Sequence, residues 1–272
     1  MLSRLQSWIG WLTSDPVGFI IYALYLCATV LLSLILHEVA HGYVAYRCGD
    51  PTAKWMGRLT LDPRKHLDPL GTICMFLLGF GWAKPVPVNP RNFKDYRRDD
   101  FLVSIAGIVT NLTLFILCSA LSVGVNRLIW TPDFLQMFRA EYGSLQGLMN
   151  PFHTDGLWAN AIASGSSYAY LSMFTQHYWL LYVQRFLLMM AQINLSLATF
   201  NLLPIPPLDG YHLVNDTLLK GRLQLNQQAF RTAQVILLLV CFSGVLSQLL
   251  SALNGAVYGA VLNLFLLITG GA

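Results

Sequence analysis

The chain has 272 residues, of which 55% are hydrophobic and 11% are charged, and its formal net charge is +4. A soluble domain carries roughly 25% charged residues, so this composition excludes an ordinary soluble protein and favours a membrane protein with short loops. We expect no nucleic-acid partner, because the basic residues lie in loops beside apolar segments, where membrane proteins carry them. The five cysteines are scattered and form no CxxC pair, so neither a disulfide framework nor a cysteine-based metal site is predicted.

Five apolar segments predict membrane-spanning helices. A span needs about 20 mostly apolar residues. The predicted spans, in chain order, are residues 17–46, 101–125, 179–203, 230–250 and 252–268. Gly255 and Gly259 interrupt the last segment, which predicts a broken or weaker helix there. The expected fold is therefore an all-α polytopic membrane protein, a bundle of about four to six transmembrane helices.

Residues 72–90, between the first two spans, are predicted to form a re-entrant β-hairpin that dips into the membrane and returns. Their apolar part is too short to cross, and their Gly and Pro residues favour a turn. Irregular backbone at membrane depth requires cover by protein or by a water-filled cavity. A surface loop with an apolar tip is the alternative.

The loops differ sharply in charge, which predicts the orientation of the bundle. Residues 47–98 contain ten of the 17 basic residues, whereas residues 126–178 contain two basic and three acidic residues. The positive-inside rule places the first loop in the cytoplasm and the second outside the cell membrane. The first span then ends toward the cytoplasmic face.

Polar residues within the first span form the strongest functional signal. His37 and His41 are four residues apart, so on a helix both rings lie on one face and can reach the same Zn²⁺. Glu38 is displaced around the helix and can reach a water on that metal. This HExxH pattern is typical of metalloproteases, and ionisable residues inside a membrane helix indicate function. A structural polar network is the alternative.

A catalytic zinc usually has three protein ligands, so one more is expected. Asp209 and His212 are both candidates, because both follow the proline-rich break after the span at residues 179–203. Spacing alone does not separate them. The remaining histidines lie in loops and are expected to be solvated or interfacial; these are His66, His153 and His177.

The motifs HEVAH and FNLLPIPPLDG, in this order at the ends of two spans, resemble those of the site-2 protease family of intramembrane zinc metalloproteases. The resemblance continues through GDPTAKWMGRLTLDPRKHLDPLGT, GWAKPVPVNPRN and SIAGIVTNL, and it covers residues 30–215. It is greatest to the bacterial branch without PDZ or CBS domains. The resemblance implies one Zn²⁺ per chain, with His37, His41 and Asp209 as ligands and Glu38 as the base that activates the zinc-bound water.

The resemblance also implies a set of substrate-binding residues. These are Asn201, which opens the NxxPxxxLDG-type motif, Asn111 of the AGxxxN motif, and Gly79 and Gly81 of the hairpin that would pair with an unwound substrate strand. Many relatives have proline where this chain has Ile108, so a helix kink is not expected there. From the residues alone, Asn111 is equally explained by helix packing with an interhelical hydrogen bond, and Asn201 by a helix C-terminal cap.

The implied function is an intramembrane zinc endopeptidase that cleaves transmembrane or membrane-proximal segments of other membrane proteins, as in regulated intramembrane proteolysis. A non-proteolytic zinc-binding membrane protein, either a pseudoprotease or a metal carrier, is the alternative. The chain is expected to be a single integral-membrane domain at residues 1–272, with a catalytic core at about 17–215 and C-terminal helices at 230–269. Its expected partners are the lipid bilayer and a membrane-protein substrate.

Overall fold

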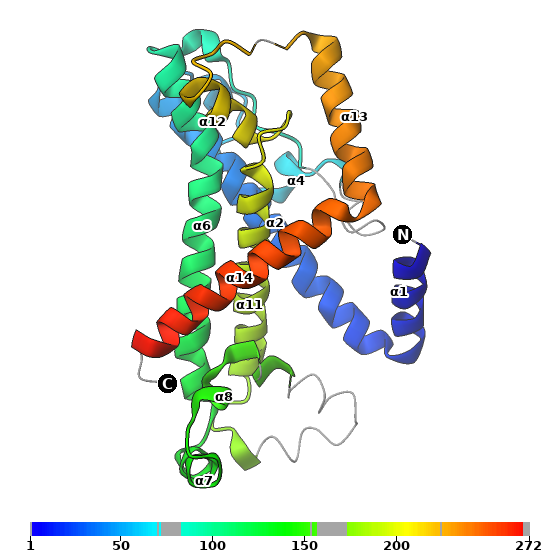
Figure 1. Ribbon diagram of the computed structural model, residues 1–272, viewed down its shortest axis with the longest axis vertical. Coiled ribbons are helices and arrows are strands. Elements are labelled where there is room, and N and C mark those ends of the chain that lie inside the picture. Colours follow the sequence, from blue (N-terminus) through cyan, green and yellow to red (C-terminus); the bar gives the residue numbers. More distant parts are fainter. Residues whose placement is uncertain are drawn as a thin grey trace. The chain divides into compact units, whose positions relative to one another are not determined.

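The computed structural model describes residues 2–69, 71, 83–152, 154–156, 173–223 and 225–268 (Figure 1). Most of these residues are helical, and β-structure among them is limited to two isolated antiparallel bridges, Leu67 with Ala83 and Trp130 with Thr175. The tip of the predicted hairpin, with Gly79 and Gly81, lies outside the described residues. The re-entrant hairpin therefore stays a prediction.

Four helices of the described part of the chain are long and apolar enough to cross a membrane. They are α2 (Pro16–Arg47), α6 (Tyr96–Ile129), α11 (Leu180–Asn201) and α14 (Val245–Ile268). The first three confirm the predicted spans at residues 17–46, 101–125 and 179–203. Helix α6 extends beyond its predicted span at both ends. The chain is thus a helical membrane protein.

The prediction for the C-terminal helices was wrong in its boundaries. The expected span at residues 230–250 is divided by Gly244, which has a φ of 79° and ends α13 (Gln227–Ser243) in the left-handed conformation that suits glycine. Helix α14 then begins at Val245 and runs unbroken through Gly255 and Gly259. An isolated glycine weakens a helix but does not end it, so the position of the break depends on which glycine adopts positive φ.

Shorter helices connect the spans, and local capping explains several of their ends. Asp15 caps α2, with Pro16 in its first turn, and the side chains of Thr131 and Asn226 cap α7 and α13. The shorter helices are α1 (Leu2–Ser14), α3 (Thr52–Trp55), α4 (Pro63–His66), η1 (Pro90–Asn92), α7 (Pro132–Tyr142), α8 (Gln146–Met149) and α12 (Asp209–Thr217).

The chain divides into two compact units. Unit 1 comprises Met1–Leu112 and Ser196–Ala252, and unit 2 comprises Thr113–Leu195 and Leu253–Ala272. In unit 1, α1 folds back on the start of α2, where the Trp11 and Phe19 ring centroids are 5.7 Å apart (Figure 1).

Unit 2 combines an apolar core with a buried amide pair. Its buried apolar residues are Val123, Ile129, Trp130, Leu148, Met149, Leu180, Leu181, Leu262 and Leu266. Beside them, Gln184 and Asn126 are fully buried, and Gln184 Nε2 donates to Asn126 Oδ1 over 2.8 Å. Asn126 Nδ2 donates in turn to the carbonyl of Leu148 over 3.0 Å. The amide pair therefore joins α6 to α11 and to α8 inside unit 2.

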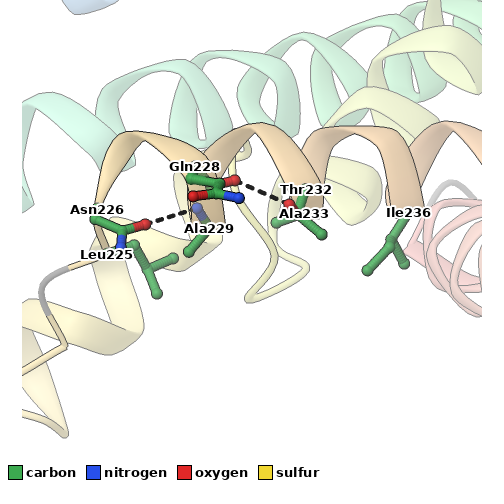
Figure 2. A pocket seen from close by; sticks show the side chains of 7 residues that line it. All are labelled: Leu225, Asn226, Gln228, Ala229, Thr232, Ala233 and Ile236. Atoms are coloured by element: carbon green, nitrogen blue, oxygen red, sulfur yellow. Dashed lines mark hydrogen bonds between the residues drawn. The ribbon is translucent and has the colours of Figure 1, made fainter.

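A shallow pocket lies on the first turns of α13. Figure 2 shows that residues of α13 line it together with Leu225 and Asn226, and that the Asn226 side chain bonds the backbone of Ala229. This hydrogen bond is the N-cap of α13, so the polar groups of the pocket serve the helix itself. None of the predicted site residues lines it.

Candidate metal centre

Helix α2 brings two imidazole rings together near its C-terminal end. His37 and His41 are one turn apart, and their ring centroids are 4.6 Å apart. Both are largely buried, with exposed fractions of 5% and 9%. Their Nε2 atoms lie 3.0 Å apart. The two rings therefore direct the same nitrogen atom into one common space, as the HExxH spacing predicted.

The first residue of α12, Asp209, supplies a carboxylate to that space. Asp209 Oδ2 lies 3.3 Å from His37 Nε2 and 3.3 Å from His41 Nε2. Gly210 makes this approach possible, because a Cβ there would overlap the backbone of Leu202 and Leu203. A close backbone contact after the proline-rich turn thus fixes where α12 begins and where the carboxylate points.

The packing of Leu208 also supports the turn that precedes α12. Leu208, which immediately precedes Asp209, is buried against Leu237 of α13 and Leu246 of α14. Burying an apolar side chain of this size stabilises its position by about 2 kcal/mol. Leu208 therefore holds the start of α12 in place while Asp209 faces the histidines.

The second candidate ligand, His212, is turned to a different partner. His212 Nδ1 lies 3.1 Å from Asp100 Oδ2 of α6, and this neighbouring carboxylate raises the pKa of His212 above its ordinary value. Within the described residues, the group whose ligand atoms converge on one another is His37, His41 and Asp209. The structure thus brings Asp209, rather than His212, to the two imidazoles.

The remaining histidines differ in exposure. His66 was expected to be solvated or interfacial, and the first of these is wrong: it is 1% exposed, and its Nε2 lies 2.8 Å from the carbonyl of Thr60 in the turn before α4. His177 is exposed, as expected, and His153 lies outside the described residues.

The centre combines atoms that accept hydrogen bonds, and it therefore requires a cation. His41 Nδ1 lies 2.6 Å from the carbonyl oxygen of Val103, which can only accept, so this nitrogen carries the proton. In the neutral ring Nε2 then holds a lone pair directed at Asp209. Burial by itself raises the pKa of the Asp209 carboxyl, but the adjacent histidines lower it below its ordinary value. Asp209 Oδ2 is buried and has no hydrogen-bond partner among the residues that the structure describes.

Two imidazole nitrogens and one carboxylate oxygen that converge on one space form the donor set of a catalytic zinc site. Three protein ligands leave a fourth position for water or substrate, which is the arrangement of hydrolytic rather than structural zinc. The residues at this centre therefore fit Zn²⁺.

Glu38 is held beside the centre by residues 83–89. The backbone N–H of Val86 donates to Glu38 Oε2 over 2.7 Å. Gly42, one turn along α2 from Glu38, admits this segment, because a Cβ there would overlap Val86 and Leu59. One carboxylate oxygen of Glu38 is thus occupied by a backbone donor.

Residues 83–89 are anchored at both ends. Arg58 donates to the carbonyls of Lys84 and Pro85, over 2.7 Å and 3.2 Å, and the backbone N–H of Asn89 donates to Asp50 over 2.7 Å. Asp50 is fully buried. Residues 83–89 are therefore fixed to the loop that follows α2.

Two of the predicted substrate-binding residues, Asn111 and Asn201, lie among the described residues. Asn111 is fully buried, and its Nδ2 lies 3.1 Å from His37 Nδ1. Asn201, the last residue of α11, bonds the carbonyl of Leu197 in its own helix, as its explanation as a helix cap predicts. The predicted substrate-binding role of both residues stays a prediction.

Two backbone groups at the centre were not predicted. They are the carbonyl of Val103, which orients His41, and the N–H of Val86, which binds Glu38. A backbone group leaves no residue-type signal in a sequence. The only available hint was Gly107, one turn from Val103, whose missing side chain makes room for both imidazole rings.

Comparisons with known proteins agree with this centre. The model of peptidase family M50 matches residues 25–244. A Bacillus subtilis (strain 168) protein named "Putative zinc metalloprotease YwhC" is 37% identical over 241 residues, which cover 89% of this chain and 90% of that protein. "Putative zinc metalloprotease Rip2" of Mycobacterium tuberculosis (strain ATCC 25618 / H37Rv) is 30% identical over 281 residues, which cover 97% of this chain and 83% of that protein.

No solved structure matches the chain. The family and the names of both relatives imply Zn²⁺ as the metal, and the described cluster of His37, His41 and Asp209 supplies a place for it. With a family match that spans most of its length, the chain belongs to peptidase family M50, the site-2 protease family that its motifs resemble.

Proposed function

We propose that this protein is an intramembrane zinc endopeptidase that cleaves transmembrane or membrane-proximal segments of other membrane proteins. The observation that carries the proposal is the convergence of His37, His41 and Asp209, from helices distant in sequence, on one space next to Glu38. Membership in a peptidase family and helices of spanning length support it. His37, His41 and Asp209 are the proposed ligands, and Glu38 is the proposed catalytic base.

Bound Zn²⁺ would supply a water of lowered pKa and polarise the scissile carbonyl. Glu38 takes the proton from that water and later donates it to the leaving amine. The backbone donor of Val86 occupies Oε2 of Glu38, so Oε1 is the oxygen that accepts the proton. The bond to Val86 also limits the rotation of the carboxylate.

A helical substrate must unwind before its peptide bonds can react, because its carbonyl and N–H groups are bonded to each other. The segment at residues 83–89 provides backbone that an unwound substrate strand can pair with, and it contacts the proposed base. Pro85 and Pro87 have no N–H to donate, and Arg58 already bonds the carbonyl of Pro85. We propose that the substrate pairs with the remaining backbone groups of this segment.

The charge pattern supports a position of the centre toward the cytoplasmic face of the cell membrane. The C-terminal end of α2, which carries the histidines, leads directly into the strongly basic loop. Water reaches a site near this face more easily than one at mid-bilayer depth. The function proposed is therefore regulated intramembrane proteolysis near the cytoplasmic side.

The test is cleavage in cells by a Glu38→Gln variant. This change keeps the size of the side chain and the metal ligands but removes the base, so zinc content should stay at the native level while cleavage stops. Glu141→Gln is the matched control, because Glu141 is the only other glutamate and is exposed on α7.

Membrane proteomes of cells with the native, Glu38→Gln and Glu141→Gln proteins should show full-length substrates accumulating only with Glu38→Gln. If no membrane protein accumulated there, the non-proteolytic alternative, a pseudoprotease or metal carrier, would replace the peptidase. Several weakly held zinc ions per chain in place of one would specifically favour the carrier.

A further inference from the structure

One face of α6 supports both imidazole rings of the metal centre. Val103, Gly107 and Asn111 are spaced by four residues, so they lie on the same side of the helix. The carbonyl of Val103 contacts His41, and a Cβ at Gly107 would overlap both rings. Asn111 completes this row, with its side-chain amide 3.1 Å from His37 Nδ1.

The contacts of Val103 and Asn111 differ in which forms of the imidazole ring they can bond. A carbonyl such as that of Val103 can only accept, so it fixes the proton of His41 on Nδ1 and leaves Nε2 free for a metal. A side-chain amide has a donor end and an acceptor end, and the two are related by a half rotation. Asn111 can therefore bond either form of the His37 ring.

In the present rotamer the donor end of Asn111 faces His37 Nδ1, and the Asn111 Oδ1 atom is buried without a hydrogen-bond partner among the described residues. Such a donor places the proton of neutral His37 on Nε2, where Asp209 Oδ2 lies 3.3 Å away. That form of the ring cannot bind a metal through Nε2. After a half rotation of the amide, Oδ1 accepts the proton of Nδ1, and Nε2 presents its lone pair.

We propose that Asn111 is a positioning residue for His37: its Oδ1 accepts the Nδ1 proton and thereby selects the ring form that binds Zn²⁺. The inference rests on the metal centre of the proposed function. It differs from the substrate contact expected for Asn111, because this side chain is fully buried and has no surface to offer a substrate. Outer partners of this kind commonly change metal affinity by about 10- to 100-fold.

The experiment measures zinc affinity in purified protein, by competition with a chelator, together with the absorption spectrum after Co²⁺ replaces Zn²⁺. Asn111→Leu removes the acceptor and should weaken zinc binding by about 10- to 100-fold and shift the Co²⁺ bands. Asn111→Asp retains an oxygen acceptor. It should bind zinc at least as tightly as the native protein does and should not show the loss expected for Asn111→Leu.

The matched control is Asn194→Leu. Asn194 is also fully buried, and its Nδ2 bonds the carbonyl of Met190 in its own helix over 2.8 Å. This variant makes the same chemical change at an amide that bonds its own helix, and it should leave both readouts at native values. If Asn111→Leu fails to fold, Asn111→Ser replaces it, because serine is too short to reach the ring and should show the same loss.

Native zinc affinity and an unchanged Co²⁺ spectrum in Asn111→Leu, or in Asn111→Ser, would overturn the inference. Equal losses in the Asn111 and Asn194 variants would also overturn it, since they would show a general effect of removing a buried amide. Failure of the proposed function has a different signature: the native protein would bind zinc but cleave nothing, with the affinity difference between the Asn111 variants intact.

Discussion

Both units bury polar side chains in apolar helices, yet the two groups are organised differently. In unit 2, a donor of Gln184 faces an acceptor of Asn126, whose own donor faces the carbonyl of Leu148. In unit 1, His41 Nε2 and Asp209 Oδ2 are both acceptors, and they face each other across 3.3 Å. In the first group every bonded donor faces an acceptor, although Gln184 Oε1 is buried without a hydrogen-bond partner among the described residues. In the second group the facing atoms of His41 and Asp209 require a proton or a metal ion between them.

This difference separates a structural polar group from a functional one. An amide pair inside a membrane protein joins helices and adds modestly to stability. Converging acceptors cost free energy unless a cation binds, so a protein retains them where the cation performs a task. The balance of donors and acceptors, rather than burial, therefore identifies the metal centre.

Removing a ligand should have the largest effect. His37→Ala leaves two of the three converging ligand atoms, and the zinc content should fall from about one ion per chain to near zero, because a catalytic site needs three protein ligands. Atomic absorption of the purified protein measures this. His177→Ala, which changes an exposed histidine, should keep its zinc. Equal zinc in the two variants would place the metal elsewhere.

Removing the metal should also destabilise the native protein. Zinc at 1,000 times its dissociation constant stabilises the folded state by about 4 kcal/mol, so a chelator should lower the thermal unfolding midpoint. The same chelator should not change the midpoint of His37→Ala, which has no zinc to lose. A midpoint that is insensitive to chelation in the native protein would contradict a cation-dependent centre.

Breaking the amide pair of unit 2 should have a smaller and purely structural effect. Gln184→Leu leaves Asn126 Oδ1 buried without its donor, which should cost about 1 kcal/mol of unfolding free energy. Zinc content and cleavage should stay native. Thermal unfolding beside Gln176→Leu, an exposed position, measures the difference. Zinc loss in Gln184→Leu would mean that the two polar groups are not independent.

The smallest expected effect is a pH dependence at Asp216 on α12. Burial, together with the nearby charge of Asp100, raises the pKa of Asp216 to about 6, and Arg97 and His212 oppose the shift. A carboxyl with a raised pKa stabilises the fold while it is protonated. Its contribution is therefore complete below about pH 4 and is lost as pH rises through about 6.

Asp216→Asn should remove this loss, so the variant should gain stability relative to the native protein between pH 4 and pH 7. Unfolding midpoints of both proteins across this range provide the measurement. Parallel pH curves would show that Asp216 does not titrate in the folded protein.

Sequence reasoning succeeded where the signal is local. Three of the spans were predicted because long apolar runs have few alternatives to a helix in a membrane. The convergence of His37 and His41 was predicted because residues four apart lie on one face of a helix. The position of the helix break was missed, because Gly244, Gly255 and Gly259 are alike in sequence and only the backbone of Gly244 adopts positive φ.

The residues themselves thus determined a helical membrane chain with a two-histidine metal motif, because periodicity and hydrophobicity depend only on neighbours along the chain. Tertiary structure decided which residue joins the histidines. Asp209 and His212 are three residues apart and chemically equivalent as candidates, and the packing of Gly210 and Leu208 turns the first to the imidazoles while Asp100 pairs with the second. Contacts between distant segments have no periodic signature, so a single sequence does not reveal them.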